Sequence, residues 1–222
     1  IKKRSGAASH VISDSVRGVT KTIYTESTSA ELTSDQYGWV SAFGTDGFTT
    51  SNTNVGAINE NGGTYVSWNW KGGGSGSTNN DGAVTSTVSA NTTSGFSIVS
   101  YTGTGSTTTV GHGLGAKPSV VIYKQRNTTN AWRMMTDVSG TLKRLYLNAT
   151  DAEASIIDSS TAPTSTVLNI GTGSEVNTSS GTYIAYCFAE KTGYSKFGTY
   201  AGNNNTDGTF VYTGFKPAWI LA

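Results

Sequence analysis

The chain is poor in charge and cysteine and has no long apolar run, and each shortage excludes a class of protein. Only 13% of its 222 residues are charged, and 15 basic residues almost balance 14 acidic ones. A balance this even provides no bulk attraction to nucleic acid. Cys187 is the single cysteine, so the chain forms no internal disulfide. No apolar run approaches about 18 residues, which excludes membrane-spanning helices. We therefore expect no nucleic-acid partner and no membrane insertion.

Small polar residues fill the deficit. Ser and Thr together number 64, and Gly adds 28, whereas Pro contributes only three. Helical bundles need Ala, Leu, Glu and Lys in quantity, so this composition argues against them. It favours short strands joined by Gly, Asn and Asp turns, which predicts an all-β protein.

The sequence repeats itself in several places. Residues 63–70 (GTYVSWNW) match residues 181–188 (GTYIAYCF), and residues 21–24 (KTIY) match residues 143–146 (KRLY) at an offset of 122. A third set recurs at an offset of 99. In that set Tyr101, Gly103, Lys117 and Pro118 correspond to Tyr200, Gly202, Lys216 and Pro217. Internal similarity of this kind indicates repeated structural units.

These matches predict how the chain is divided. We expect residues 1–71 to be a β-sandwich unit that lacks its opening strands, and residues 72–94 to be a Gly/Ser/Asn-rich connector. Residues 95–190 are predicted to be a complete unit, and residues 191–222 to be the opening strands of a further unit. The predicted fold is therefore a tandem array of antiparallel, jelly-roll-like β-sandwich units of about 100 residues.

Side-chain alternation identifies the closing strand of a unit. Ile184, Tyr186 and Phe188 alternate with the smaller Ala185 and Cys187, which is the period of a β-strand. A heavy face and a light face suit a sheet that packs on another sheet. Cys187 is interpreted as a packing residue, because the matching copy has Asn69 in its place.

Residues that carry chemistry are sparse, and we predict no catalytic residue, no metal and no cofactor. A Ser-His-Asp arrangement would have to use His10 or His112. One cysteine and two distant histidines do not make a zinc site. The Asn-rich loops before Asp81-Gly82 and Asp207-Gly208 offer oxygen atoms to calcium, yet they fit plain turns better. The acidic residues are scattered, so we do not expect an enzyme.

Several stretches resemble a known family. Residues 182–190 (TYIAYCFAE), 193–198 (GYSKFG) and 210–219 (FVYTGFKPAW) resemble a repeat domain of uncharacterised virion and tail-fibre-like structural proteins of marine bacteriophages. Residues 11–18 (VISDSVRG) and 65–71 (YVSWNWK) look like other parts of that domain. The resemblance implies a structural role at a virion surface or in another extracellular fibre, and it brings no catalytic residues.

Repeats that are cut at both ends suggest self-assembly. The C-terminal strands would complete the first unit of a neighbouring copy, head to tail, because an unpaired strand edge is a template for another strand. The same joint would be covalent if the chain is an excerpt of a longer array and not a processed subunit, and the sequence leaves both readings open. The expected interface residues are Ile1, Lys2, Lys3, Phe210, Tyr212, Phe215, Trp219, Ile220 and Leu221.

The competing class is a lectin-like adhesion module that binds a glycan or a receptor at a cell surface. Trp39 and Trp132 fall in loop-like contexts, where an exposed indole can stack on a sugar ring. Exposure of these two rings is the feature that separates this hypothesis from assembly.

Overall fold

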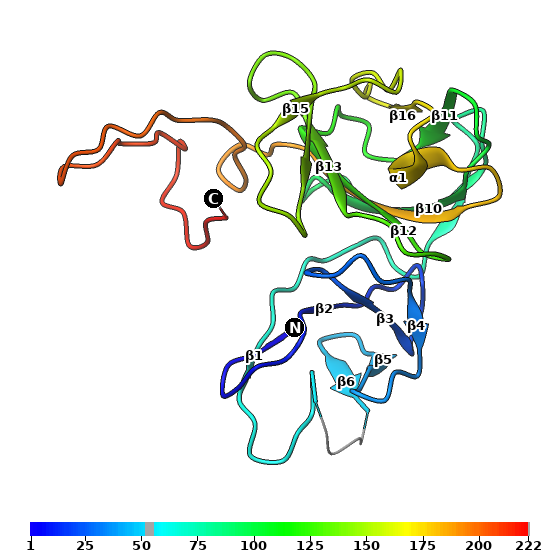
Figure 1. Ribbon diagram of the computed structural model, residues 1–222, viewed down its shortest axis with the longest axis vertical. Coiled ribbons are helices and arrows are strands. Elements are labelled where there is room, and N and C mark those ends of the chain that lie inside the picture. Colours follow the sequence, from blue (N-terminus) through cyan, green and yellow to red (C-terminus); the bar gives the residue numbers. More distant parts are fainter. Residues whose placement is uncertain (52–55, 222) are drawn as a thin grey trace.

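Antiparallel strands dominate the computed structural model, which describes residues 1–51 and 56–221. In that part of the chain the single helix is α1, Ser174–Asn177. The prediction of an all-β protein is confirmed. Figure 1 shows the N-terminal strands below a larger sheet and the C-terminal residues extending away from both.

An eight-stranded antiparallel sheet forms the centre of the molecule. Its strand order is β15-β14-β13-β12-β17-β10-β9-β8, so β17 lies between β12 and β10 although it is last in the sequence. The strands are β8 Ser77–Asn79, β9 Ser86–Asn91, β10 Phe96–Thr102, β12 Val120–Gln125, β13 Arg133–Thr136, β14 Lys143–Tyr146, β15 Ala154–Ser155 and β17 Thr182–Phe188.

Both faces of this sheet are covered. Ala185 and Cys187 of β17 point into the main core, where β11 (Thr108–Gly111) and β16 (Val167–Ile170) pair and pack over the sheet. Ile184 and Tyr186 point the other way, into a second core that includes Ile23 of the N-terminal region. The predicted alternation along this strand is confirmed, because successive side chains of a strand leave opposite faces.

The N-terminal region, residues 1–71, forms small antiparallel sheets in the orders β2-β3-β4, β1-β7 and β5-β6. Ile1 joins the first two sheets, because its nitrogen and oxygen both hydrogen-bond to the backbone of Val11, at 2.7 and 2.9 Å. The strands are β1 Lys2–Lys3, β2 Val11–Ile12, β3 Lys21–Tyr24, β4 Leu32–Thr33, β5 Val40–Phe43, β6 Phe48–Thr50 and β7 Tyr65–Val66.

The pairing of the N-terminal strands recurs residue for residue in the large sheet. Adding 122 to both members of each pair in β2-β3-β4 gives the pairs of β13-β14-β15. The pairs of β1-β7 likewise become pairs of β12-β17 when 122 is added to each β1 residue number and 118 to each β7 residue number. Examples are Ile12–Ile23 against Met134–Leu145, Thr22–Leu32 against Arg144–Ala154, and Lys2–Val66 against Lys124–Ile184. The sequence repeat is thus matched by a recurring pattern of strand pairing.

One matching pair of strands differs in length. β17 runs for seven residues and is paired on both edges, to β10 and to β12. Its counterpart β7 runs for two residues and pairs with β1 on one edge, and no other described strand borders it. Residues 67–70 continue the same alternating sequence beyond β7 without a partner, and Trp68, Asn69 and Trp70 are exposed. A strand needs a neighbour to hold its backbone hydrogen bonds, so β7 stops where β1 stops.

Residues 72–94, expected to be a connector, instead contribute two strands. β8 and β9 lie within them and extend the large sheet beyond β10. Val88 of β9 reaches the main core, which explains how so polar a segment is held in the sheet. The stretch before β8 remains irregular and joins the N-terminal region to this edge.

Residues 195–221, which we call the C-terminal arm, contain no strand. Opening strands were expected here. The arm begins at Ser195, which forms an isolated bridge with Lys191, and most of its residues are exposed. Figure 1 shows it in orange and red, reaching away from the sheets before it turns back. Sequence matching β10, β11 and the start of β12 is therefore present a second time, in residues that form no strand.

Candidate assembly surface

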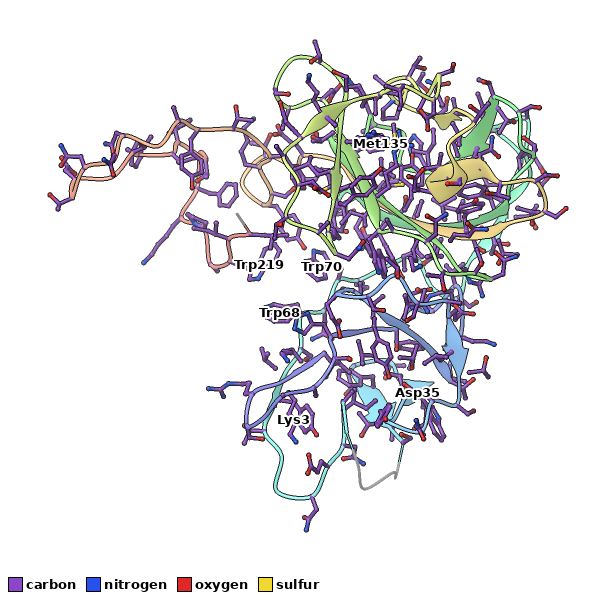
Figure 2. All side chains as sticks on the ribbon, viewed as in Figure 1. Lys3, Asp35, Trp68, Trp70, Met135 and Trp219 are labelled. Atoms are coloured by element: carbon purple, nitrogen blue, oxygen red, sulfur yellow. The ribbon has the colours of Figure 1, made fainter. Side chains whose placement is uncertain are left out.

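An aromatic cluster marks the place where three parts of the chain meet. Trp70 follows β7, Phe188 ends β17, and Trp219 comes from the C-terminal arm. The Trp70 ring lies 5.6 Å from that of Trp219 and 6.1 Å from that of Phe188, both edge-on, which is a favoured arrangement for aromatic pairs. Figure 2 shows Trp70 and Trp219 side by side, with Trp68 close to them. All three tryptophan side chains stay about half exposed, between 40% and 50%.

The sequence repeat identifies which positions of the large sheet correspond to the two residues of this contact. Trp70 occupies the place of Phe188, and Trp219 occupies the place of Val120. In the large sheet Val120 and Phe188 are directly paired across β12 and β17. The contact between Trp219 and Trp70 therefore joins two positions that are strand partners in the complete sheet.

The N-terminal half of the predicted interface is already paired within the chain. Lys2 and Lys3 form β1 opposite Val66 and Tyr65, and the Lys3 ammonium binds the Glu60 carboxylate. Ile1 packs at the edge of a small core around Val11. These three residues correspond to the second half of β12. They therefore fill the strand position beside Tyr65 and Val66 and leave it empty beside residues 68–70.

The C-terminal half of the predicted interface is the most exposed apolar part of the described chain. Phe210 is 85% exposed, and Tyr212, Ile220 and Leu221 each exceed 70%. Phe215 is half-buried within the arm itself. The ring contact of Trp219 is with Trp70, which belongs to neither predicted half of the interface.

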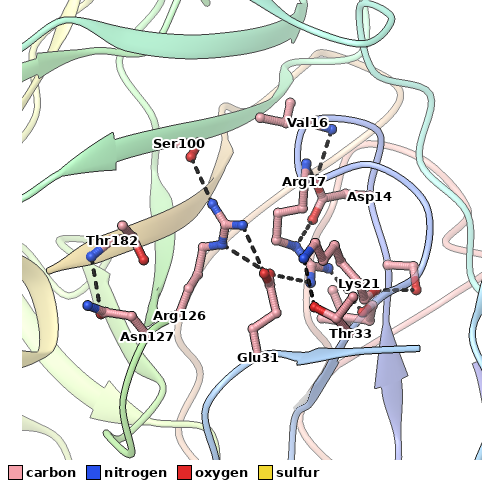
Figure 3. Close-up of polar contacts among 12 residues, drawn as sticks. Asp14, Val16, Arg17, Lys21, Glu31, Thr33, Ser100, Arg126, Asn127 and Thr182 are labelled. Atoms are coloured by element: carbon pink, nitrogen blue, oxygen red, sulfur yellow. Dashed lines mark hydrogen bonds and ion pairs between the residues drawn. The ribbon is translucent and has the colours of Figure 1, made fainter. Parts of the chain in front are cut away.

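A buried ionic cluster fastens the N-terminal region to the large sheet (Figure 3). Glu31 accepts two hydrogen bonds from Arg126, at 2.9 and 3.0 Å, and one from Arg17 at 3.2 Å. Arg126 also donates to the Ser100 hydroxyl at 3.3 Å. Burial raises the pKa of Glu31, but hydrogen bonds from Arg126 and the charge of Arg17 outweigh it and leave the pKa below its usual value.

Asp14 extends this cluster to β17. It accepts a hydrogen bond from Arg17 Nε at 2.5 Å and one from the Tyr186 hydroxyl at 2.7 Å. Burial opposes ionisation of Asp14, yet Arg17 and these hydrogen bonds keep its pKa lowered. Sequence reasoning missed this cluster, because its members are up to 172 residues apart and no local pattern links them. The His10 ring lies 3.8 Å from the Glu26 carboxylate.

The two tryptophans of the glycan hypothesis lie in different surroundings. Trp132 is fully buried, and its indole N–H donates to the Tyr24 carbonyl at 2.8 Å. Its ring stacks on Tyr186 inside the second core, so no sugar reaches it in this structure. Trp39 is half-buried next to β5. Burial of Trp132 removes one of the two features on which that hypothesis depended.

Titratable side chains elsewhere are placed for packing. Within residues 1–51 and 56–221, no three His, Cys, Asp or Glu side chains gather as metal ligands. Burial raises the pKa of Cys187 to about 12, which keeps its thiol protonated. His112 is buried, which lowers its pKa, and its ring lies 3.3 Å from the Thr164 carbonyl. None of the described helices is long and apolar enough to cross a bilayer.

Comparison with known proteins places the chain in a family. A family model described as Domain of unknown function (DUF7483) matches residues 1–222, so the chain belongs to this family. No curated protein matches the chain. No solved structure matches it either. The family assignment carries no activity, so function has to be argued from the geometry above.

Proposed function

We propose that this protein is a structural component of a virion surface, tail fibre or other extracellular filament, and that it assembles by donating strands to its neighbour. The observation that carries the proposal is the mismatch between β17 and β7. The same sequence pattern makes a seven-residue strand with two partners in one place and a two-residue strand with one partner in the other. An incompletely paired strand is a template for another strand.

The same proposal gives the fold its finer description. The N-terminal region and the body of the chain are two copies of one antiparallel β-sandwich unit of about 100 residues, arranged in tandem. The first copy lacks the counterparts of β10, β11 and the start of β12. Those counterparts are residues of the C-terminal arm, as the sequence offset of 99 indicates.

Exposure of the arm supports this role. Soluble monomers seldom leave a contiguous apolar segment in water, and such segments commonly mark interaction sites. Here Phe210, Tyr212, Ile220 and Leu221 are all largely exposed. Burying them against a neighbour would supply the hydrophobic contribution to assembly, while backbone pairing sets its direction.

The surfaces that meet are different, and this decides the form of the assembly. The donor is the arm and the acceptor is the edge of β7, so each copy both gives and receives. Contacts of this heterologous kind propagate into filaments unless rotation closes them into rings. Location at a virion or fibre rests on the sequence resemblance, whereas the mode of assembly rests on the geometry.

Negative-stain electron microscopy of the purified chain tests the proposal. We expect regular filaments or rings from the full chain, and single particles from a chain that lacks residues 195–222. Filaments or rings with the same repeat spacing from the shortened chain would refute strand donation. Single particles from the full chain at all concentrations would refute self-assembly.

Exposed indoles favour one second candidate, which is binding of a cell-surface glycan. Trp68, Trp70 and Trp219 present half-exposed rings close together, and such rings suit stacking on sugars. A glycan array probed with the full chain and with Trp68→Ala tests this. Binding that disappears in the variant would support a lectin-like role in place of assembly.

A further inference from the structure

We infer that the arm of one chain enters the N-terminal region of a second copy in one defined register, with Trp219–Leu221 on one edge of residues 64–70 and residues 195–201 on the other. This inference deepens the proposed assembly and rests on it. It names the acceptor site, the occupant and the strand partners.

The large sheet supplies the template for the first edge. β10 pairs with β17 from Phe96 opposite Phe188 to Thr102 opposite Thr182. Adding 99 to each β10 residue number and subtracting 118 from each β17 residue number transfers these seven pairs to the arm and to residues 64–70, which we call the β7 segment. The transferred pairs are Ser195–Trp70, Lys196–Asn69, Phe197–Trp68, Gly198–Ser67, Thr199–Val66, Tyr200–Tyr65 and Ala201–Thr64.

The second edge follows from β12. Val120, Val121 and Ile122 lie opposite Phe188, Cys187 and Tyr186. The same offsets place Trp219 opposite Trp70, Ile220 opposite Asn69 and Leu221 opposite Trp68. On this edge of the β7 segment, β1 of the acceptor already pairs with Tyr65 and Val66. The incoming residues 219–221 would pair with the residues after Ser67 and so extend the strand position of β1.

Side-chain chemistry agrees with this register. In the large sheet Ile98, Tyr186 and Ile122 lie on one face and form part of the second core. Their counterparts in the composite sheet are Phe197, Trp68 and Leu221, which are all apolar or aromatic. A shift by one residue would turn the strand over and place Lys196 or Ile220 in their positions. A one-residue shift of residues 195–201 would therefore place a lysine on the apolar face, which disfavours that shift.

A second copy is the occupant that the arm's own course favours. In its own chain the arm touches the acceptor segment through Trp219, while Tyr200 and Leu221 stay 61% and 72% exposed. Figure 1 shows the arm leading away from both sheets. Residues 195–201 therefore leave one edge of residues 64–70 without a strand partner, although they belong to the same molecule. Residues 195–197 hold contacts with Lys191, Glu190 and Phe188 of their own chain, which they would exchange for strand pairing with a neighbour.

Disulfide trapping in the full chain tests the register. Ser67→Cys and Gly198→Cys are single variants that form a directly opposite pair in the proposed sheet, at a separation that suits a disulfide. A Cβ at Gly198 meets no atom within 4 Å, so this substitution fits. Asn69→Cys is the matched control, because it lies two residues from the proposed partner. Cys187 is buried and stays unreactive.

The two single variants are mixed under mild oxidation, and the linked dimer is identified by mass spectrometry. We expect the dimer of Ser67→Cys with Gly198→Cys to form at least tenfold faster than that of Asn69→Cys with Gly198→Cys. Equal rates, with assembly still dependent on the arm in microscopy, would overturn the register while leaving strand donation intact. A double variant that carries both Ser67→Cys and Gly198→Cys tests which chain the arm enters. An intrachain disulfide in this variant, with no linked dimer from the mixed single variants, would show that the arm pairs with its own chain and not with a second copy.

Discussion

Trp219 meets Trp70 edge-on at 5.6 Å between ring centroids, and the positions they occupy are those of Val120 and Phe188 in the large sheet. Val120 and Phe188 are held opposite each other by the backbone pairing of β12 and β17. Trp219 and Trp70 lack that backbone pairing, since neither residue belongs to a described strand. The ring contact thus joins two positions whose counterparts are strand partners, without the backbone pairing that holds those counterparts together.

Removal of the Trp219 ring is expected to weaken assembly. Buried aromatic anchors at interfaces contribute about 2 kcal/mol or more, so Trp219→Ala should raise the concentration needed for half-assembly by roughly thirtyfold. Tyr194→Ala is the matched control, because Tyr194 is also exposed but precedes the arm and lies outside the proposed strand pairs. Light scattering over a concentration series measures both. Equal effects of the two substitutions would contradict the role given to Trp219.

Glu31→Gln is expected to loosen the N-terminal region from the large sheet. Glu31 neutralises Arg17 and Arg126, and loss of one partner from a buried ionic cluster costs about 3 kcal/mol. Glu153 holds the matching position in the repeat, and it is exposed, so Glu153→Gln should change the free energy of unfolding by less than about 0.5 kcal/mol. Urea denaturation followed by circular dichroism measures both. A small effect at Glu31 would show that the cluster adds little to stability.

Acid should unfold the protein through its buried carboxylates. The pKa values of Asp14 and Glu31 are lowered, and that of Asp158 falls to about 2 because hydrogen bonds from Arg133 and Ser160 outweigh burial. The unfolded chain therefore binds protons first, at pH values near the usual 3.8 and 4.5. Stability is full above about pH 5 and falls as the pH drops from there toward 2. The midpoint in urea, measured between pH 7 and pH 3, should follow this course, and a flat profile would contradict the ionic cluster.

Trp132→Phe should destabilise the contact between the two regions by about 2 kcal/mol. The substitution leaves the Tyr24 carbonyl without its donor and opens space in a fully buried site. Trp39→Phe is the control, because the Trp39 ring is half-buried. Thermal unfolding should show a clearly lower midpoint for Trp132→Phe than for Trp39→Phe. The reverse order would mean that Trp39, and not Trp132, carries the packing.

Local sequence patterns predicted the strands that have strong alternation and missed those that do not. Ile184 and Tyr186 were placed on one face from their spacing alone, because a strand imposes a period of two. β8 and β9 carry mostly Ser, Thr and Asn, so nothing in their composition separates them from a connector. β9 is a strand because β10 offers it an edge, and β8 in turn pairs with β9; these edges exist only in the folded sheet.

The candidate assembly surface also has one part that the sequence predicts and another part that it does not. The repeat predicted that the C-terminal arm and the N-terminal region carry complementary segments, and this stays a prediction. Burial of Trp132 could not be predicted, because it depends on Tyr24, which lies 108 residues away in the sequence. Pairing of Glu31 with Arg126 likewise joins residues 95 apart. Contacts of this kind arise from packing of one region on another and leave no local signal.

Sedimentation velocity of the full chain and of the chain lacking residues 195–222, each over a hundredfold range of concentration, tests the central claim most directly. We predict that the full chain sediments as growing oligomers as its concentration rises, whereas the shortened chain stays at the sedimentation coefficient of a monomer throughout. Growth that persists without the arm, or a full chain that remains monomeric at every concentration, would contradict assembly by strand donation.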